Sequence, residues 1–243
     1  MAKGLESRSG ARKRAASRPL ARRARGDGSA AEAALRERFR SLVDFDRGFA
    51  LPGRALAGVD EAGRGALAGP VVSAAVVLRD DVDLVRVYDS KAVREGDREA
   101  LFRDIVASAV SVGISFGHPA LIDRENILCT TLMTMHRAVA ALRVDVGLVL
   151  VDGRESFQWD GRLIPVVKGD SKSLTVAAAS IVAKVARDRL MRRLHHRYPC
   201  YHFDRNKGYG TAEHLDAIAT HGAADVHRRT FLAKIVENNL SMF

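Results

Sequence analysis

Three apolar runs in the sequence each lead into an aspartate. The runs are AGVD, LVLVD and IPVVKGD, and they end at Asp60, Asp152 and Asp170. Ligands of open α/β sheets bind beyond the strand ends, where carboxylates that are remote in sequence can converge. One such aspartate, taken alone, is more often a turn residue or a helix cap. Three of them together favour a shared functional site.

A fourth carboxylate, Glu61, directly follows Asp60. Successive strand residues point to opposite faces, so this pair shares a site only if the strand ends or bulges there, which Gly63 and Gly65 permit. Four clustered carboxylates repel each other unless a divalent cation neutralises them. Oxygen ligands favour Mg²⁺ or Mn²⁺, and two such ions form the usual clamp for phosphodiester hydrolysis. The pattern therefore indicates metal-dependent nuclease chemistry.

The elements that must position these carboxylates alternate between strands and helices. Period-2 and short buried apolar runs predict strands at 55–60, 71–78, 84–87, 111–117, 148–151 and 163–167. Helical spacing of apolar residues predicts helices from about residue 30 and at 94–110, 126–142, 174–195 and 211–220. This alternation is typical of an α/β fold with one mixed sheet.

The basic charge of the chain is concentrated at its N-terminus. The 243 residues carry a formal net charge of +10, and residues 1–30, with nine basic and two acidic side chains, supply +7 of it. This segment has few large apolar residues, so we expect a disordered tail at 1–30 and a folded domain at 31–243. The tail is either a tether for phosphate backbones or a solubilising extension, and a transit peptide is a weaker alternative.

Several protein classes are excluded by composition. No apolar stretch approaches the roughly 20 residues of a transmembrane helix, and no basic start leads into an apolar secretory segment, so we expect a cytoplasmic protein without a membrane partner. Cys129 and Cys200 lie far apart without a CxxC pair, which excludes a disulfide framework and a cysteine-rich zinc site. We expect a monomer.

The sequence around the carboxylates resembles bacterial ribonuclease HII, the type 2 ribonuclease H. The resemblance covers about 35–231 and is carried, in the family's order, by GVDEAGRGALAGPVVSAAVVL, DSK, LIDRENIL, LVDGR, VVKGDSKSLTVAAASIVAKVARD and NKGYGT. It implies a ribonuclease H-like α/β fold, with a central mixed five-stranded sheet flanked by helices and a small helical C-terminal part at about 195–243. It also implies that the catalytic metal ligands, for two Mg²⁺ or Mn²⁺ ions, are Asp60, Glu61, Asp152 and Asp170.

The resemblance also implies a substrate and the residues that contact it. The family hydrolyses the RNA strand of RNA:DNA hybrids and cuts duplex DNA 5′ to embedded ribonucleotides, leaving 3′-hydroxyl and 5′-phosphate ends. In the family the GRG loop, here Gly63, Arg64 and Gly65, recognises the 2′-hydroxyl, which alone distinguishes RNA from DNA at one position. Tyr209 matches a tyrosine that stacks on the neighbouring deoxyribose. Further substrate-contact candidates by position are Ser90, Lys91, Lys172 and Lys184.

Two other functions compete with this hypothesis. A non-catalytic basic nucleic-acid binder would carry positive charge without an acidic cluster, because acids at a phosphate site are counterproductive unless metals bind there. A type 3 ribonuclease H would show a GKG-like loop and a folded N-terminal domain, whereas this chain has GRG and a low-complexity tail. Both features favour type 2.

The last residues of the chain are unusually apolar for a terminus. Leu240, Met242 and Phe243 lie in NLSMF, which resembles the pentapeptide by which bacterial repair proteins bind the sliding clamp. An apolar terminus either docks on a partner or packs on its own domain. The sequence leaves both open.

Overall fold

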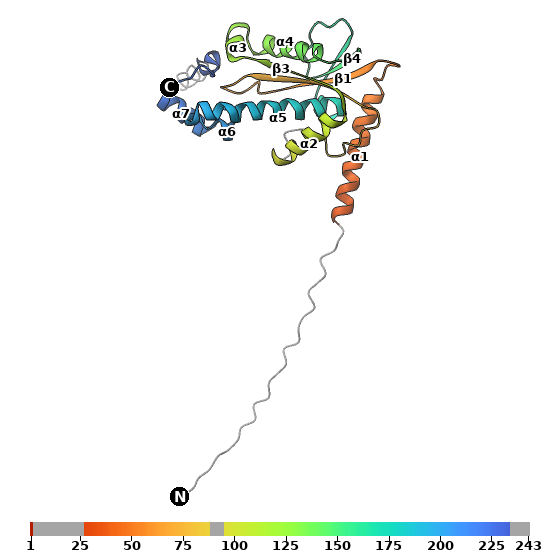
Figure 1. Ribbon diagram of the computed structural model, residues 1–243, viewed down its shortest axis with the longest axis horizontal. Helices are drawn as coiled ribbons and strands as arrows, with labels where there is room; N and C mark the ends of the chain where they lie inside the picture. The colour runs from red at the N-terminus through yellow and green to blue at the C-terminus, as the bar shows by residue number, and fades with distance from the viewer. Residues whose placement is uncertain (2–26, 88–94, 234–243) are drawn as a thin grey trace.

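The computed structural model describes residue 1 and residues 27–87 and 95–233 of the chain (Figure 1). These residues form one mixed five-stranded sheet with the strand order β3-β2-β1-β4-β5. The strands are β1 (Ala55–Ala62), β2 (Val71–Leu78), β3 (Ala109–Gly117), β4 (Val146–Asp152) and β5 (Arg162–Val166). The predicted fold class, a central mixed five-stranded sheet flanked by helices, is confirmed.

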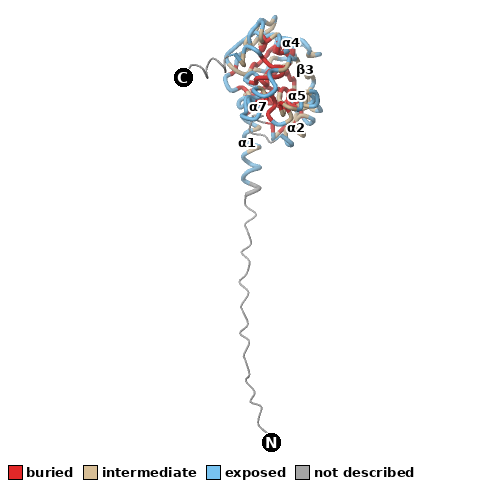
Figure 2. The backbone as a smooth tube through the Cα atoms, turned by 90° about the vertical axis from the view of Figure 1, so that its left-hand side faces the viewer, coloured by how far each residue is buried: buried red, intermediate tan, exposed pale blue. Residues whose placement is uncertain are grey.

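Helices cover both faces of the sheet (Figure 1). One face carries α5 (Leu174–Arg197), α2 (Glu95–Ser108) and α1 (Asp27–Arg47), and the other carries α3 (Pro119–Glu125) and α4 (Ile127–Ala140). Alternate residues of β2 divide between the faces: Ala74 and Val76 pack with α5, while Ala75 and Val77 pack with α4. Burial on both sides, visible as the core in Figure 2, explains why the strands are continuous apolar runs.

The sheet places Asp60 of β1 beside the end of β4. β2 is antiparallel to β1 and β3, whereas β4 is parallel to β1 and β5. Val59 lies opposite Val151 in the parallel pair, so Asp60 and Asp152 follow matched positions on neighbouring strands. Their convergence is therefore a result of strand register.

A smaller helical part follows α5. It contains the 3₁₀ turn Pro199–Tyr201, α6 (Phe203–Asn206) and α7 (Ala212–His221). Its own apolar cluster centres on Tyr201 and Phe203 and includes Ala68 from the loop after β1. This part therefore packs directly on the loop that carries GRG.

The structure differs from the predicted elements in two places. Residues 84–87 do not form a strand; Leu84 and Val87 are instead buried as loop residues in the core beneath α5. The helix expected at 126–142 is present as α4, whereas α3 before it was not predicted. Asn126 separates the two helices: it has a φ of +68°, and its side chain caps α4 by accepting from the Cys129 N–H at 3.0 Å. This positive φ, which is uncommon for a residue other than glycine, ends α3 and starts α4.

Some predictions lie partly or wholly outside the described residues. Helix α1 begins at Asp27, within the segment assigned to the tail, and residues 2–26 of that segment are not described. Ser90, Lys91 and the apolar C-terminal residues Leu240, Met242 and Phe243 also lie outside the described residues. Within the described ranges, the helices are too short or too polar to cross a membrane.

Asp46 connects α1 to the start of α5. This buried carboxylate accepts a hydrogen bond from the Thr175 N–H at 2.9 Å, and burial raises the pKa of Asp46 to about 6. Between pH 4 and 6 the folded protein therefore binds more protons than the unfolded chain, so this group makes stability fall as the pH rises through that range.

Asp46→Asn is expected to remove this pH dependence. An amide oxygen still accepts from Thr175, but it carries no buried charge. Relative to the parent, the variant should gain about 3 kcal/mol in unfolding free energy between pH 4 and pH 7, the equivalent of a two-unit pKa shift. Urea unfolding across that range measures the gain, and a constant difference between the two proteins would contradict it.

Candidate active site

Asp60 and Asp152 are each held by a backbone amide. Asp60 is 5% exposed; its Oδ1 accepts from the Glu61 N–H at 2.6 Å, and its carboxylate also bonds to the Ser180 side chain of α5. Asp152, the last residue of β4, accepts from the Gly169 N–H at 2.6 Å. These bonds orient both carboxylates where the pairing of β1 with β4 ends.

The strand end or bulge expected at Asp60 and Glu61 is not present, because β1 continues in regular register with β2 as far as Ala62. Glu61 nevertheless lies close enough to Asp60 to raise its pKa. The Glu61 side chain is 14% exposed, and its Oε1 lies 3.4 Å from the Arg64 guanidinium. Asp170 belongs to the 3₁₀ turn Gly169–Ser171, whose first amide binds Asp152. The hydrogen bond from Gly169 therefore keeps the backbone that carries Asp170 next to the end of β4.

The site concentrates negative charge. Burial, and then the neighbouring carboxylates of Glu61 and Asp152, raise the pKa of Asp60 well above its usual range. A cation would relieve this repulsion, and the donors are all oxygen atoms, as hard divalent ions require. In the described part of the chain, however, no three acidic, histidine or cysteine side chains are arranged closely enough to form a complete metal-binding group. The four-ligand set stays a prediction.

The two glycines of the GRG loop serve different needs. Gly63 has a φ of +92°, and a Cβ there would lie 2.5 Å from the Arg187 Cδ, so the fold itself requires glycine. A Cβ on Gly65 would meet no atom within 4 Å. Nothing in the described fold demands glycine at position 65.

Two fully buried arginines hold the loop that runs from GRG to β2. Arg187 of α5 donates to the carbonyls of Ala68 and Pro70 at 3.1 and 3.0 Å. Arg228, beyond α7, donates to the carbonyls of Gly63 and Arg64, each at 2.8 Å. Sequence reasoning missed both residues.

A signal for Arg187 was present in the sequence. Its neighbours at four-residue spacing, Ala183 and Met191, are buried, so Arg187 lies on the apolar face of α5. A charged residue on such a face implies specific partners. Arg228 lies among polar residues, and no comparable pattern marks it.

The NKGYG segment packs against the same loop. The Leu67 and Ala68 N–H groups donate to the Gly208 carbonyl at 2.8 and 3.2 Å. The Tyr209 ring is stacked near Arg187, whose guanidinium carbon lies 5.2 Å from the ring centroid, and Tyr209 is 37% exposed. The loop that carries GRG and the segment that carries Tyr209 are thus packed against each other.

The candidate lysines lie in different surroundings. Lys172 is exposed after the 3₁₀ turn. Lys184 is paired with Asp188 at 2.6 Å, and burial lowers the pKa of its ammonium group.

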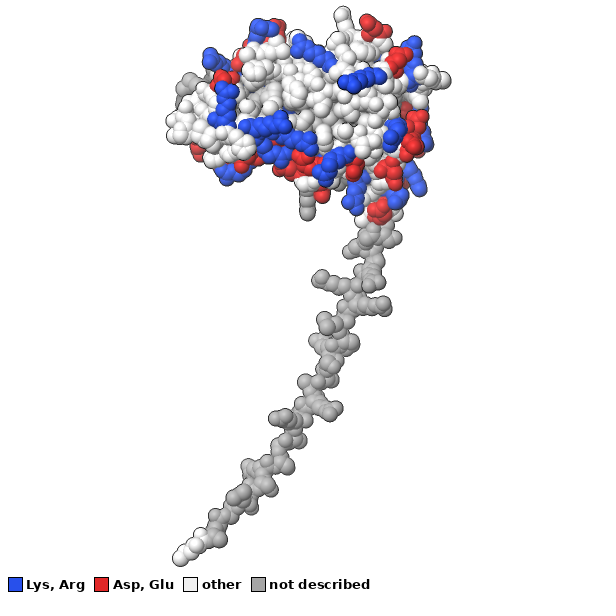
Figure 3. Space-filling view, viewed as in Figure 1, with Lys and Arg blue, Asp and Glu red and all other residues white. Residues whose placement is uncertain are grey.

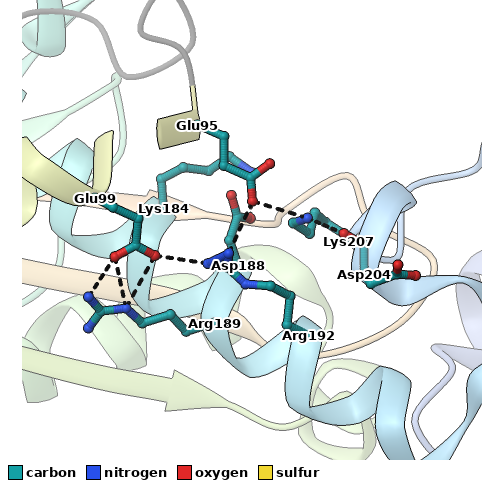
Figure 4. Close-up of polar contacts among 8 residues, drawn as sticks. All are labelled: Glu95, Glu99, Lys184, Asp188, Arg189, Arg192, Asp204 and Lys207. Atoms are coloured by element: carbon teal, nitrogen blue, oxygen red, sulfur yellow. Dashed lines mark hydrogen bonds and ion pairs between the residues drawn. The ribbon is translucent and has the colours of Figure 1, made fainter. Parts of the chain in front are cut away.

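Around Lys184, α2 and α5 are joined by ion pairs (Figure 4). Glu99 binds Arg189 at 2.6 Å and Arg192 at 2.9 Å, and Glu95 lies 3.3 Å from Lys207. Because α2 starts at Glu95, these pairs hold the first turns of α2 against α5 and Lys207.

Comparison with known families decides the assignment. The family model described as Ribonuclease HII matches residues 57–234, well over half of the chain. The chain belongs to the ribonuclease HII family. Among curated ribonuclease HII proteins, that of Delftia acidovorans is 52% identical over 176 residues, covering 72% of this chain and 75% of its own. That of Levilactobacillus brevis is 47% identical over 198 residues, covering 82% and 77%.

Solved structures agree with this assignment. Ribonuclease H2 from Pyrococcus horikoshii superposes with a TM-score of 0.64 at 27% identity, over 76% of this chain and 98% of its own. The ribonuclease HII in a PCNA complex from Archaeoglobus fulgidus gives 0.63 at 26% identity, over 72% and 94%. A ribonuclease HIII crystallised with Mn²⁺ gives 0.57 at 18% identity, over 75% and 68%, and shares the fold.

Membership in the ribonuclease HII family makes this protein an endoribonuclease of the ribonuclease H class. The catalytic hypothesis is thereby confirmed over the non-catalytic binder, and type 2 over type 3.

Proposed function

We propose that this enzyme hydrolyses the RNA strand of RNA:DNA hybrids and cuts duplex DNA on the 5′ side of an embedded ribonucleotide. The products would carry 3′-hydroxyl and 5′-phosphate ends. The observation that carries the proposal is the buried Asp60, flanked by the carboxylates of Glu61 and Asp152, in a ribonuclease HII chain.

We also propose that Asp60, Glu61, Asp152 and Asp170 hold Mg²⁺ or Mn²⁺. The all-oxygen donor set and the crowding of negative charge around Asp60 support this ligand set. When bound, the ions would supply an activated water and stabilise the leaving oxygen. The backbone amides of Glu61 and Gly169 keep the two central aspartates in place for that role.

The GRG loop and Tyr209 would recognise the sugars. Arg228 occupies the carbonyls of Gly63 and Arg64, and the space beside Gly65 is open to an approaching ribose. A backbone contact to the 2′-hydroxyl gives sugar specificity without base specificity. The exposed Tyr209 ring, 37% accessible, would stack on the adjacent deoxyribose.

A duplex with one ribonucleotide tests the function directly. With Mg²⁺ or Mn²⁺ we expect one cut 5′ to the ribonucleotide, and no cut in an all-DNA duplex or with excess EDTA. End-group analysis should find a 3′-hydroxyl, because metal-activated water is the nucleophile. A 2′,3′-cyclic phosphate would refute the proposal, since it requires attack by the neighbouring hydroxyl.

Gly65→Ala separates substrate recognition from folding. Since a Cβ at this position meets no atom within 4 Å, the melting temperature should stay within about 2 °C of the parent. Activity on the single-ribonucleotide duplex should fall about 10- to 100-fold, because the methyl group occupies the space needed by the ribose. Full activity of a stable Gly65→Ala protein would contradict the proposed ribose contact.

Nucleic-acid binding is further supported by charge. Figure 3 shows Lys and Arg side chains in a band along α5, with acidic side chains among them. The proposed substrate contacts also include Ser90, Lys91, Lys172 and Lys184. Residues 1–30 are a proposed tether to phosphate backbones. We further propose a cytoplasmic monomer.

The archaeal ribonuclease HII neighbour was solved in a complex with PCNA. We propose that Leu240, Met242 and Phe243 dock similarly on a sliding clamp. Self-packing of this terminus is the alternative.

A further inference from the structure

The dipeptide His227–Arg228 lies between the two loops that the proposed function assigns to the substrate. The Arg228 N–H donates to the Leu67 carbonyl at 2.8 Å, and His227 forms a β-bridge with Ala68. Both side chains are at most 2% exposed, and they extend to different loops.

Arg228 determines the shape of the loop that contains GRG. Its Nη2 donates to the Gly63 carbonyl at 2.8 Å and to the Gly69 carbonyl at 2.9 Å, and its Nη1 donates to the Arg64 carbonyl at 2.8 Å. Nε adds a second bond to Gly69 at 3.0 Å. A planar guanidinium makes these bonds in fixed directions, which an ammonium group cannot reproduce.

His227 reaches the other loop through His214 of α7. The Ala224 N–H donates to the His227 Nδ1 at 3.0 Å, the two Nε2 atoms lie 3.1 Å apart, and the His214 Nδ1 lies 2.9 Å from the Tyr209 carbonyl. The Ala224 carbonyl is farther from Nδ1, at 3.3 Å, and already accepts from the His227 N–H.

The backbone groups at the two ends of this series of hydrogen bonds determine which ring nitrogens carry protons. An amide N–H can only donate, so the His227 Nδ1 is bare and its Nε2 carries the proton. A carbonyl can only accept, so the His214 Nδ1 carries the proton and its Nε2 accepts from His227. A second proton on His214 would place two hydrogens between the Nε2 atoms, so the arrangement requires both rings to be neutral.

The surroundings keep the imidazoles neutral. The rings of Tyr201 and Phe203 pack on His227, with centroids 4.7 and 5.8 Å away. Burial, with His214 adding to it, lowers the pKa of His227 to about 4, and burial also lowers the pKa of His214. The charged neighbours are Arg228, adjacent in sequence, and Asp225, whose carboxylate partly offsets the lowering of the His227 pKa.

We propose that His227–Arg228 is a positioning element that fixes the GRG loop and Tyr209 relative to each other. It thereby determines the preference of the enzyme for an RNA–DNA junction, that is, for a ribonucleotide next to a deoxyribonucleotide. Arg228 fixes one loop by its carbonyls, and the ordered His227–His214 pair fixes the other at the Tyr209 carbonyl. The inference rests on the proposed substrate roles of these loops.

Arg228→Lys tests the first half of the proposal, with Arg229→Lys, an exposed neighbour, as the matched control. Well below the melting temperature of each protein, Arg228→Lys should raise KM for a single-ribonucleotide duplex about tenfold with kcat within twofold, and reduce the preference for that duplex over an all-RNA hybrid. Arg229→Lys should change neither. Loss of stability with unchanged KM and preference would overturn the proposal.

Two substitutions at His214 test the second half. Asparagine keeps a donor near Nδ1, facing Tyr209, whereas glutamine keeps a polar group near Nε2, facing His227. Positioning predicts that His214→Asn retains the parent KM and junction preference better than His214→Gln, whichever variant is the more stable. Equal KM values for the two, or a KM closer to the parent for His214→Gln, would overturn it.

A substrate-free measurement separates this inference from the proposed function. Nitrogen-15 NMR of the imidazoles should show the proton on Nε2 of His227 and on Nδ1 of His214 at pH 7; the same tautomer in both rings, or a charged ring, would overturn the proposal. If this tautomer pattern is found but Gly65→Ala and Tyr209→Ala leave the junction preference intact, the proposed loop roles fail, and the positioning of specificity fails with them.

Discussion

Asp60→Asn is expected to lower cleavage of a ribonucleotide-containing duplex by about 1000-fold and, in the same protein, to raise the melting temperature. The loss corresponds to the several kcal/mol that a metal site contributes to a transition state. The gain follows because the parent buries a charge beside Glu61 and Asp152, and this raises the pKa of Asp60. Asparagine keeps an oxygen that can accept from the Glu61 N–H without carrying that charge.

The sign of the stability change depends on pH. A carboxyl whose pKa is higher in the folded state costs stability above its unfolded pKa of about 4, so the advantage of Asp60→Asn should grow as the pH rises from 4 to 7. Melting should be measured in EDTA, so that metal binding does not stabilise the parent selectively. The exposed Asp160→Asn is the matched control and should change neither activity nor stability. An unfolded Asp60→Asn protein would show that this carboxylate is structural.

Gly58→Ala is expected to cause the largest loss of stability, about 3 kcal/mol or more, or roughly 10 °C in melting temperature. A Cβ on Gly58 would lie 2.5 Å from the Thr175 carbonyl oxygen and would also overlap the Val176 nitrogen, and both atoms are helix backbone. The first turn of α5 must therefore move away from β1, which carries Asp60 two residues later. Activity should fall with stability.

Gly96→Ala is the matched control for this steric effect. A Cβ on Gly96 meets no atom within 4 Å, and the residue lies in α2, so alanine should stabilise the protein by up to about 1 kcal/mol. Circular dichroism melts of the two variants measure the contrast. Similar melting temperatures for Gly58→Ala and the parent would mean that α5 can shift at little cost.

The sequence was most informative where structure follows from local patterns. The strands 55–62 and 146–152 are apolar because both their faces are covered. Asp60 and Asp152 directly follow the paired residues Val59 and Val151, so fold class and the nearness of these carboxylates could be predicted, although β1 itself continues to Ala62. The buried loop at Leu84–Val87 was mistaken for a strand because apolar residues in a loop look the same.

The hydrogen bonds that hold the GRG loop and Asp152 in place could not be predicted from such local patterns. Arg228 binds backbone carbonyls, which every residue has, so the residue types of its partners do not reveal these bonds. The same holds for the bond between Gly169 and Asp152, in which the donor is a backbone amide. Residues that act through their own side-chain chemistry can be recognised in a sequence, whereas residues that bind backbone groups mostly cannot.

The bond between Arg228 and the Gly63 carbonyl closes a loop of 165 residues, and that with the Arg64 carbonyl closes one of 164. Contacts this distant in sequence form late, because the chain entropy of closure must be offset by structure already present. During synthesis, the sheet and α5 can be complete while the substrate loop still lacks its anchor. The sheet and α5 therefore form before the loop that is proposed to recognise the substrate is fixed. A chain released before residue 228 would retain most of the core, but its GRG loop would lack the bonds from Arg228.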